Sequence, residues 1–291
     1  MVRGPLPWVL AVSSGFARDR MRGSGVDAHA VLAAYDEQVR RNPDAARGRH
    51  VERDGHVVRV VADEDDGWSG VVWSDLDGVD ADAVIAAQAS RFAELRATWE
   101  WKYYSYDRPE DLPERLRAAG LEPDPVEGLL VADIDELHLA VPPPSGVRLV
   151  PVTDAQGADA LVRVHNEVFG GDHASVGRAV LAALGDRPGT GQAVLAMAGG
   201  TAVSAGRVEF HEGTDFASLW GGGTLAAWRG RGVFRSLVAY RAALAKDRGF
   251  RYLQVDASAD SRPILHRLGF VQLATTTPYT LPEPSSSPLS G

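Results

Sequence analysis

The sequence predicts an α/β (α+β) protein made of two similar halves. Segments with strand-like alternation are followed by segments whose apolar residues recur at helical spacing. The same order of segments occurs on both sides of the proline-rich run 142–146. A chain of 291 residues, of which 45% are apolar, is long enough for two ordinary domains. Together these observations predict a layered structure of strands and helices in each half.

Each half contains two predicted strand–helix pairs. In the first half, the predicted strands are 71–76 and 99–106 and the predicted helices are 80–97 and 112–119. In the second half, the predicted strands are 217–225 and 251–256 and the predicted helices are 233–246 and 261–268. Gly120 and Gly269 follow the last helix of each half, where helix C-terminal glycines belong. Their separation nearly equals that of the helix starts Asp80 and Gly230, which suggests a duplication.

The composition excludes several classes of protein. The chain has no cysteine, which rules out disulfides, thiolate metal sites and a cysteine nucleophile. Its net charge of −9 argues against a nucleic-acid partner, because such a partner needs a basic face. A cationic small molecule or peptide would be attracted instead, although this charge is also ordinary for solubility. No apolar run approaches the about 20 residues that cross a bilayer, so we expect a cytoplasmic protein without a membrane partner.

The segment that carries chemistry is 220–235, in which a predicted strand leads through a glycine-rich turn into a helix. The first amides of a helix have no intrahelical partner, and together with the helix dipole they favour an anion. Gly230 and Gly232 allow a ligand to approach the backbone, and nearby arginines add positive charge. The alternative is a surface turn with solvated arginines. The strand before the turn and the amphipathic helix after it favour a phosphate site.

The pattern Arg229-x-x-Gly232-x-Phe234 resembles the Arg/Gln-x-x-Gly-x-Gly/Ala turn with which GNAT-superfamily acyltransferases bind the pyrophosphate of coenzyme A. It is neither a Walker loop nor the dinucleotide fingerprint, because the Gly-Lys-Ser/Thr and the third glycine are missing. The resemblance covers residues 146–281 and implies two GNAT-like domains, each a mixed, mostly antiparallel twisted sheet flanked by helices. It adds strands at 146–152, 192–198 and 202–210 and helices at 154–169 and 174–184.

Composition and the resemblance together predict five segments along the chain, the extension, linker and tail from their composition and the two domains from the resemblance. They are a disordered extension 1–25, a degenerate GNAT-like domain 26–140, a proline-rich linker 141–146, a GNAT acetyltransferase domain 147–281 and a disordered tail 282–291. The first half is expected to lack coenzyme A, because four aspartates occupy its equivalent turn, 75–82, and would repel a pyrophosphate. It would serve as a structural partner or as one wall of the substrate cleft.

The second half is expected to hold the coenzyme A site. The residues that the resemblance implies are Gly222, Gly223, Thr224, Arg229, Gly230, Arg231, Gly232, Val233, Phe234, Arg235 and Ser258. Phe234 departs from the family pattern, which has glycine or alanine there, so its side chain would have to turn into the core. Ser258 stands where the family often has asparagine, and a serine there could equally cap the helix that follows.

Acyl transfer to an amine needs a base, because an alkylamine with a pKa of about 10.4 is mostly protonated at neutral pH. The candidate bases are Glu167 and Glu209, which are expected beside the acceptor cleft. The usual GNAT general acid is a tyrosine at the position of Leu265, so water or a substrate group would protonate the thiolate here. The His-Glu-x-x-His and Gly-x-Ser-x-Gly motifs are missing, so we expect no metal and no serine hydrolase.

The resemblance implies an N-acetyltransferase that moves an acetyl group from the cosubstrate acetyl-CoA to a primary amine. The acceptor would be a small molecule or a peptide, and the protein a monomer or a homodimer. The alternative is a non-catalytic acyl-CoA-binding sensor or scaffold, which Leu265 favours. A third interpretation keeps the enzyme but changes the acyl group.

Overall fold

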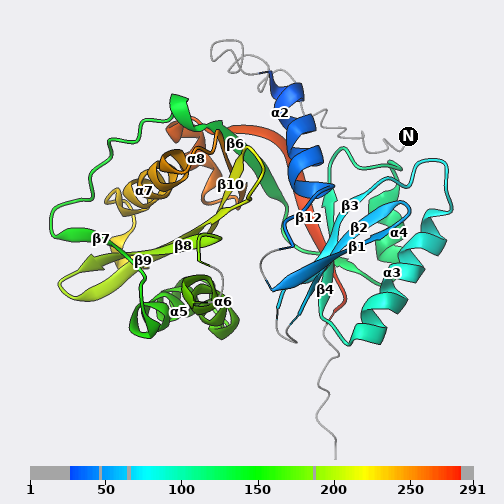
Figure 1. Ribbon diagram of the computed structural model, residues 1–291, viewed down its shortest axis with the longest axis horizontal. Helices are drawn as coiled ribbons and strands as arrows, with labels where there is room; N and C mark the ends of the chain where they lie inside the picture. Colours follow the sequence, from blue (N-terminus) through cyan, green and yellow to red (C-terminus); the bar gives the residue numbers. More distant parts are fainter. Residues whose placement is uncertain (1–26, 46–47, 64–66, 186–187, 283–291) are drawn as a thin grey trace, which may run out of the picture.

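The computed structural model describes residues 27–45, 48–63, 67–185 and 188–282. Within them, one open sheet of twelve strands runs through the molecule in the order β1-β2-β3-β4-β12-β6-β11-β10-β9-β8-β7, and the short β5 pairs with β12. Figure 1 shows two lobes at the ends of this sheet, joined by the strands in its middle. The expected extension 1–25 lies outside the described residues, and so does the tail 282–291 apart from Pro282.

The first lobe begins with α2 (Ala28–Tyr35), which continues into the π-helical turn η1 (Asp36–Arg40). Its strands are β1 (Arg49–Asp54), β2 (Val57–Ala62), β3 (Ser69–Ser74), β4 (Trp99–Tyr104), β5 (Glu122–Pro123) and β6 (Glu127–Asp133). Two helices accompany them, α3 (Ala81–Leu95) between β3 and β4, and α4 (Leu112–Ala118) after β4. The 3-10 turn η2 (Ile134–Glu136) follows β6, and residues 137–146 then contain no helix or strand.

The second lobe has the strands and helices that the sequence predicts and, in addition, the strand β12 and the turn η3. Its strands are β7 (Val147–Pro151), β8 (Gly191–Ala198), β9 (Thr201–Phe210), β10 (Phe216–Thr224), β11 (Tyr252–Ala257) and β12 (Val271–Thr280). Its helices are α5 (Ala155–Phe169), α6 (Ala174–Gly185), the 3-10 turn η3 (Ala226–Trp228), α7 (Val233–Asp247) and α8 (Arg262–Leu268). The predicted strands and helices of both halves lie within a few residues of the observed ones.

The two lobes repeat one unit, a strand, a helix and a second strand parallel to the first. In the first lobe this unit is β3–α3–β4, and in the second it is β10–α7–β11. Parallel neighbours need a crossover connection, which α3 and α7 supply. The other strand pairs of the described chain are antiparallel. The predicted α/β (α+β) class, with a mixed, mostly antiparallel sheet flanked by helices, is confirmed.

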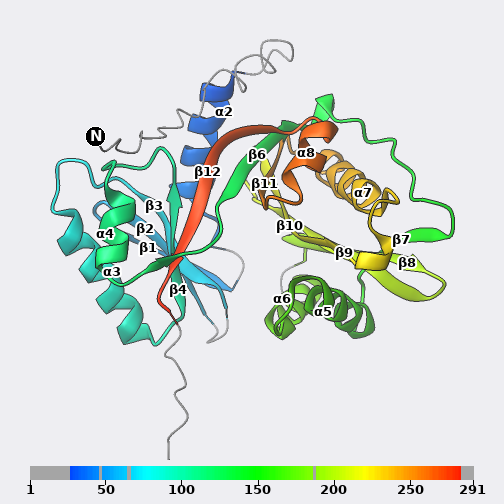
Figure 2. The ribbon, with the colours of Figure 1, turned by 180° about the vertical axis from the view of Figure 1, so that it is seen from behind.

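The last strand of each half pairs with a strand of the other half. Strand β6 lies between β11 and β12, with Leu130 opposite Val255 of β11. Strand β12 in turn lies between β6 and β4, with Tyr279 opposite Trp101 of β4. Figure 2 shows β6 and β12 crossing the middle of the molecule side by side. Residues of the first half, beginning with Glu127, are thereby placed next to the second lobe.

Helices cover both faces of the second-lobe sheet. On one face, Val238 and Ala242 of α7 pack with Leu219 of β10 and Leu253 of β11. On the other face, Leu161 and Val164 of α5 pack against β8 and β9. Helix α2 packs farther along this second face, where Tyr35 contacts Phe216 and Tyr104 and so bridges the lobes. Side chains of alternate strand residues therefore supply two separate cores.

Candidate active site

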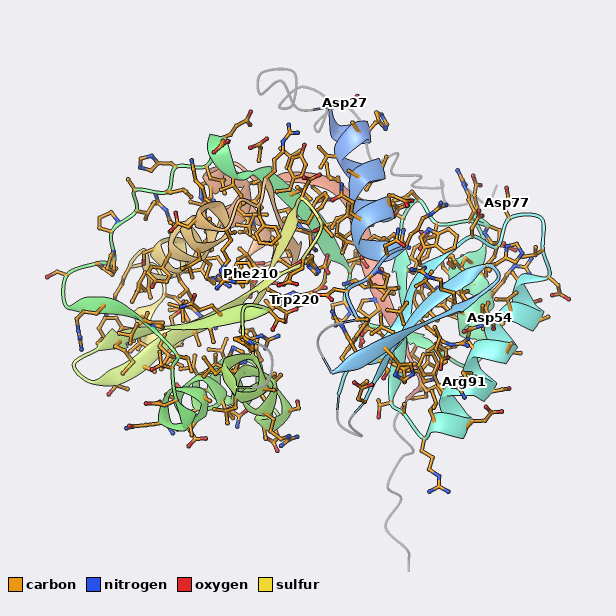
Figure 3. The ribbon with its side chains drawn as sticks, viewed as in Figure 1. Asp27, Asp54, Asp77, Arg91, Phe210 and Trp220 are labelled. Carbon is orange, nitrogen blue, oxygen red and sulfur yellow. The ribbon has the colours of Figure 1, made fainter. Side chains whose placement is uncertain are left out.

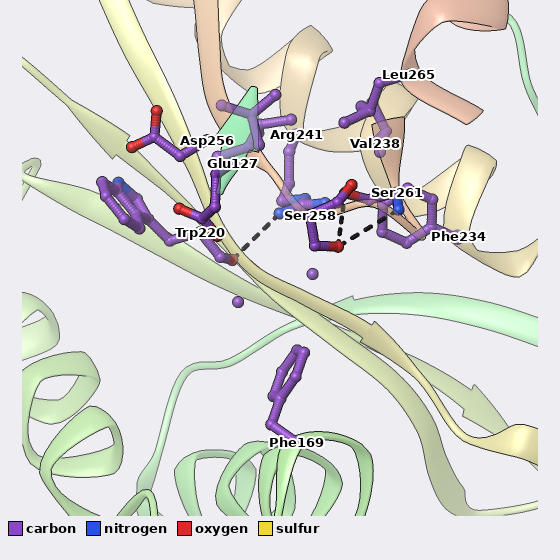
Figure 4. A pocket seen from close by; sticks show the side chains of 14 residues that line it. Glu127, Phe169, Trp220, Phe234, Val238, Arg241, Asp256, Ser258, Ser261 and Leu265 are labelled. Carbon is purple, nitrogen blue, oxygen red and sulfur yellow. Dashed lines mark hydrogen bonds between the residues drawn. The ribbon is translucent and has the colours of Figure 1, made fainter. Parts of the chain in front are cut away.

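The site forms where strands β10 and β11 separate. Their parallel pairing covers Phe216–Ser218 and Tyr252–Gln254, and β10 then bulges between Trp220 and Gly223. A cavity of about 190 Å³ opens beyond the bulge (Figure 4). The residues that line it are Glu127, Phe169, Leu219, Trp220, Gly221, Gly222, Phe234, Val238, Arg241, Val255, Asp256, Ser258, Ser261 and Leu265.

Helix α5 lies so close to the bulge that β10 needs glycine there. A Cβ at Gly221 would lie 2.6 Å from the ring of His165, and one at Gly223 would lie 2.9 Å from the ring of Phe169. The His165 Nε2–H donates to the carbonyl of Gly221 at 2.9 Å. Burial lowers the pKa of His165 to about 4, so the ring is neutral at physiological pH. Phe169 closes the cavity from the side opposite Arg241 in Figure 4.

The N-terminus of α7 opens beside this cavity without a side-chain cap. Its N-cap is Gly232, whose φ of 88° lies in the left-handed region that favours glycine. A Cβ at Gly232 or Gly230 would meet nothing within 4 Å, so the space in front of the helix is open. The N–H of Ser236 is bonded to the carbonyl of Gly232 at 3.1 Å. The amides of 233–235 therefore point out of the helix start, where an anion can accept from them.

The equivalent helix of the first lobe, α3, starts in a different way. The carboxylate of Asp80 accepts a hydrogen bond from the N–H of Ala83 at 3.1 Å. A negatively charged side chain thus occupies the place where an anion would bind. Because α7 lacks such a cap, it is the better anion site of the two.

Three exposed arginines surround the start of α7. The Arg229 Nε–H donates to the carbonyl of Thr224 at 3.1 Å, which holds the turn against the end of β10. The guanidinium of Arg231 lies 4.8 Å from the centre of the Trp228 ring. The side chain of Arg235 is exposed on the first turn of the helix. They add positive charge to the amides, as the sequence led us to expect.

Arg241 of α7 is a cation buried inside the cavity wall, with 1% of its surface exposed. Its Nε donates to the carbonyl of Leu237 at 3.1 Å, and its Nη1 donates to those of Arg207 at 2.9 Å and Trp220 at 3.4 Å (Figure 4). Burial, together with the charge of Arg207, lowers the pKa of Arg241 to about 9. Within the described chain, no carboxylate forms an ion pair with it. Arg241 is therefore a charged group at neutral pH that has no counter-ion among the residues that the structure describes.

Two carboxylates line the cavity where β6 and β11 meet. Glu127 is partly buried, and burial raises its pKa to about 7, with a further contribution from the negative charge of Asp256. Asp256 has a 3% exposed side chain and accepts a hydrogen bond from Gln254 Nε2 at 2.9 Å. In Figure 4, Asp256 and Glu127 lie on one side of Arg241, and Phe234 lies on the other. The cavity therefore has a cationic wall and an acidic end.

Lys102 of β4 supplies the counter-ion of Asp256 across the two exchanged strands. Its Nζ donates to a carboxylate oxygen of Asp256, and its side chain is 12% exposed. Burial acts to lower the pKa of Lys102, but the negative charges of Asp256 and Glu100, the nearby Tyr35 and the hydrogen bond to Asp256 together outweigh it, so the pKa is raised. Lys102 Nζ also lies 5.4 Å from the centre of the Trp220 ring. Figure 3 shows Trp220 at the end of the second lobe that faces the first.

The other residues expected to bind coenzyme A have varied surroundings. The hydroxyl of Thr224 is buried and lies 2.8 Å from that of Ser204. Val233 is buried in a core cluster, so it can offer a ligand only its amide. The ring of Phe234 packs partly into the α7 core, which keeps its amide available. Ser258 lines the cavity, and its hydroxyl accepts from the N–H of Ser261 at 3.4 Å.

The two glutamates expected as bases do not line this cavity. Glu167 is exposed on α5, two residues before Phe169, which does line it. Glu209 of β9 is partly buried, and its carboxylate lies 3.6 Å from Arg207. Glu127 does line the cavity. It lies on the exchanged strand β6 and so comes from the first half of the chain.

Sequence reasoning missed Glu127, Lys102, Asp256 and Arg241. The exchange of β6 and β12 brings Glu127 into the cavity lining and Lys102 next to Asp256. No spacing in the sequence predicts this exchange. A signal did exist for Arg241, because it lies four residues after Leu237, on the apolar face of the predicted helix. A charged residue on such a face is buried when the helix packs, and a buried charge needs a partner or a function that offsets the cost of its burial.

Comparisons with known proteins decide the fold family. No family profile matches the sequence, and no curated protein matches it. A GCN5-related N-acetyltransferase from Kribbella flavida has 20% identity, covering 88% of this chain and 96% of its own, with a TM-score of 0.65. A tandem GNAT protein from the clavulanic acid biosynthesis pathway has 14% identity, covering 80% and 83%, with a TM-score of 0.55. The chain has the GNAT fold.

The GNAT fold extends over both lobes. The GCN5-related N-acetyltransferase from Sphaerobacter thermophilus has 15% identity, covering 91% of this chain and 90% of its own, with a TM-score of 0.58. The predicted resemblance is thus confirmed in the arrangement of elements. Within the described ranges, no helix has the length and apolarity that a membrane span needs. Nor do those ranges contain a cluster of three or more metal-ligating side chains.

Proposed function

We propose that this GNAT-fold protein transfers an acyl group from acetyl-CoA to a primary amine of a small molecule or peptide. The observation that carries the proposal is the cavity at the β10–β11 separation. It adjoins an uncapped helix N-terminus at one end and a carboxylate with a pKa of about 7 at the other. One end suits the phosphates of the donor, and the other suits the amine of the acceptor.

The residues around α7 fit a pyrophosphate. The amides of 233–235 point outward, and positive charge comes from three exposed arginines. Open space in front of Gly230 and Gly232 leaves room for the phosphate oxygens. Helix N-termini with this combination bind phosphate groups readily. The donor would then extend along β10 toward the cavity, past Gly222 and Phe234.

Glu127 is the base of the proposed reaction. An amine acceptor arrives as an ammonium ion, which the acidic end of the cavity attracts. A carboxylate with a pKa of about 7 is ionised in half of the molecules at neutral pH and can take the proton. Lys102 neutralises Asp256, so Glu127 is the carboxylate of this pair that stays available.

The first test is calorimetric titration with acetyl-CoA, coenzyme A and 3′-dephospho-coenzyme A. We expect one site per chain, weakened at least tenfold in Gly232→Glu by a carboxylate facing the outward amides. Gly78→Glu is the matched control, because Gly78 also has a left-handed φ, of 73°, and open space around its Cβ position. Equal binding by both variants, or no binding at millimolar ligand, would contradict the proposal.

The second test measures thiol release with a panel of amines. Glu127→Gln should lower kcat/KM by about 10²–10⁴-fold and remove the rise of kcat/KM with pH centred near pH 7. Glu167→Gln and Glu209→Gln examine the bases expected from the sequence in the same assay. A larger loss of kcat/KM in either of these variants would assign the role of base to that glutamate and not to Glu127.

The second candidate function is an acyl-CoA sensor or scaffold without catalysis. The observation that favours it is Leu265, an apolar side chain that is 1% exposed and lines the cavity. A leucine cannot donate a proton to a leaving thiolate. Tight binding of acetyl-CoA without turnover of any amine in the panel would support this function over the enzyme.

A further inference from the structure

The proposed reaction leaves a negative charge on sulfur, and this inference rests on that reaction. An ammonium acceptor first gives a proton to Glu127. The free amine then attacks the thioester carbon, so a C–N bond forms while the C–S bond breaks and its electron pair stays on sulfur. The nitrogen loses its second proton, which finally converts the thiolate into a thiol. Until that proton arrives, the thiolate needs a positive partner in a site that excludes water.

The cavity geometry indicates where that sulfur lies. The phosphates of the donor bind at the start of α7, and the amine binds beside Glu127 at the other end. The sulfur therefore lies on the α7 side of the reacting carbon. Arg241 lies about 12 Å along α7 from Val233, since each residue advances about 1.5 Å. A donor that extends from the α7 amides toward Glu127 must pass this arginine.

We propose that Arg241 is the catalytic cation that binds the leaving thiolate. Its guanidinium is 1% exposed, lines the cavity and has no carboxylate partner among the described residues. A buried charge without a counter-ion is costly, and an incoming anion removes that cost. The attraction is strong because the surroundings have a low dielectric constant. Arg241 thus supplies electrostatic stabilisation where Leu265 can supply no proton.

The acidic end of the cavity argues against another use of Arg241, the binding of a carboxylate on the acyl group. The acyl tail extends from the reacting carbon away from the phosphates. A tail carboxylate would therefore approach Glu127, the carboxylate that Lys102 does not neutralise, and the charge of Glu127 repels it. The thiolate is the anion that the arrangement favours.

Arg241 also has a structural role, and the variants must separate the two. Its Nη1 donates to the carbonyls of Arg207 and Trp220, which ties β9 to the bulge of β10. Arg241→Gln keeps hydrogen-bond donors without the charge, and Arg241→Lys keeps the charge without the planar guanidinium. Arg248→Gln is the matched control, because Arg248 Nη1 donates to the carbonyl of Gly189 at 2.8 Å and does not line the cavity.

The experiment titrates the thiol of bound coenzyme A by the ultraviolet absorbance of the thiolate. We expect binding to the wild-type protein to lower the thiol pKa of coenzyme A by about one to two units from its value in the free ligand. Arg241→Gln should return it to about the free value, Arg241→Lys should keep part of the shift, and Arg248→Gln should keep all of it. An unshifted thiol pKa in a wild-type complex would overturn the proposal and leave the proposed function standing.

A second measurement uses only the wild-type protein, in case the Arg241 variants do not fold. The affinity for coenzyme A should rise with pH between the bound and free thiol pKa values, by up to about tenfold per pH unit. Desulfo-coenzyme A, which lacks the sulfur, should show no such rise. Equal pH dependence of both ligands would refute the thiolate contact. So would tighter binding of malonyl-CoA than of acetyl-CoA, and no binding of coenzyme A would overturn the proposed function as well.

Discussion

Removal of one partner of the Lys102–Asp256 ion pair should strongly destabilise the joined lobes. It links β4 of the first half to β11 of the second across β12 and β6. Both side chains are largely removed from water, at 12% and 3% exposure. Lys102→Met keeps an unbranched apolar stem of similar length and removes the charge. Asp256 is then left with one hydrogen bond, from Gln254 at 2.9 Å.

The magnitude follows from the burial of the carboxylate that remains. Removing one partner of a buried ion pair costs about 3–5 kcal/mol, since the other charge is left uncompensated. We expect about 3 kcal/mol for Lys102→Met, at the lower end, because Gln254 still donates to Asp256.

Urea unfolding at pH 8 measures this effect. The double variant Lys102→Met with Asp256→Leu should recover most of the loss, because no buried charge remains unpaired. Lys246→Met is the control, because Lys246 pairs with Asp135 at 2.8 Å through side chains that are 50% and 80% exposed. It should unfold at the same urea concentration as the wild type. An unchanged midpoint for Lys102→Met at pH 8 would refute the reasoning, and so would a double variant less stable than either single one.

Three further predictions concern single contacts. Asp80→Ala removes the cap of α3 and should cost about 1 kcal/mol in urea unfolding, while calorimetric binding of coenzyme A stays unchanged. Gly223→Ala brings a Cβ within 2.9 Å of the Phe169 ring and should destabilise by about 1–3 kcal/mol in the same unfolding assay. Asp256→Asn removes a charge that raises the pKa of Glu127, so the pH dependence of kcat/KM should move to lower pH. A move to higher pH would contradict the assignment of Glu127 as the base.

The order of elements could be predicted from the sequence because helices and strands depend on local periodicity. The apolar face of α7 and the alternation in β11 each lie within one short segment. The glycine-rich turn before Val233 is also local, since its φ values and outward amides depend on neighbouring residues. For the same reason, the aspartates of the equivalent turn indicated a difference between the halves, and Asp80 does cap α3.

Pairings between distant strands were decided by the tertiary structure. The exchange of β6 and β12 depends on which strand edges become neighbours when the two lobes pack together. The residue pattern of one strand does not predict which strand it will pair with. Through that exchange Glu127 lines the cavity and Lys102 pairs with Asp256, so their roles could not be predicted from the second half alone. The surroundings of Arg241 likewise could not be predicted from its own helix, because β9 and β10 supply the carbonyls that it contacts. The sequence by itself determined the elements with clear local periodicity and the glycine-rich turn before α7, whereas long-range packing decided which charges meet at the cavity, since burial and charge neighbours exist only in the folded chain.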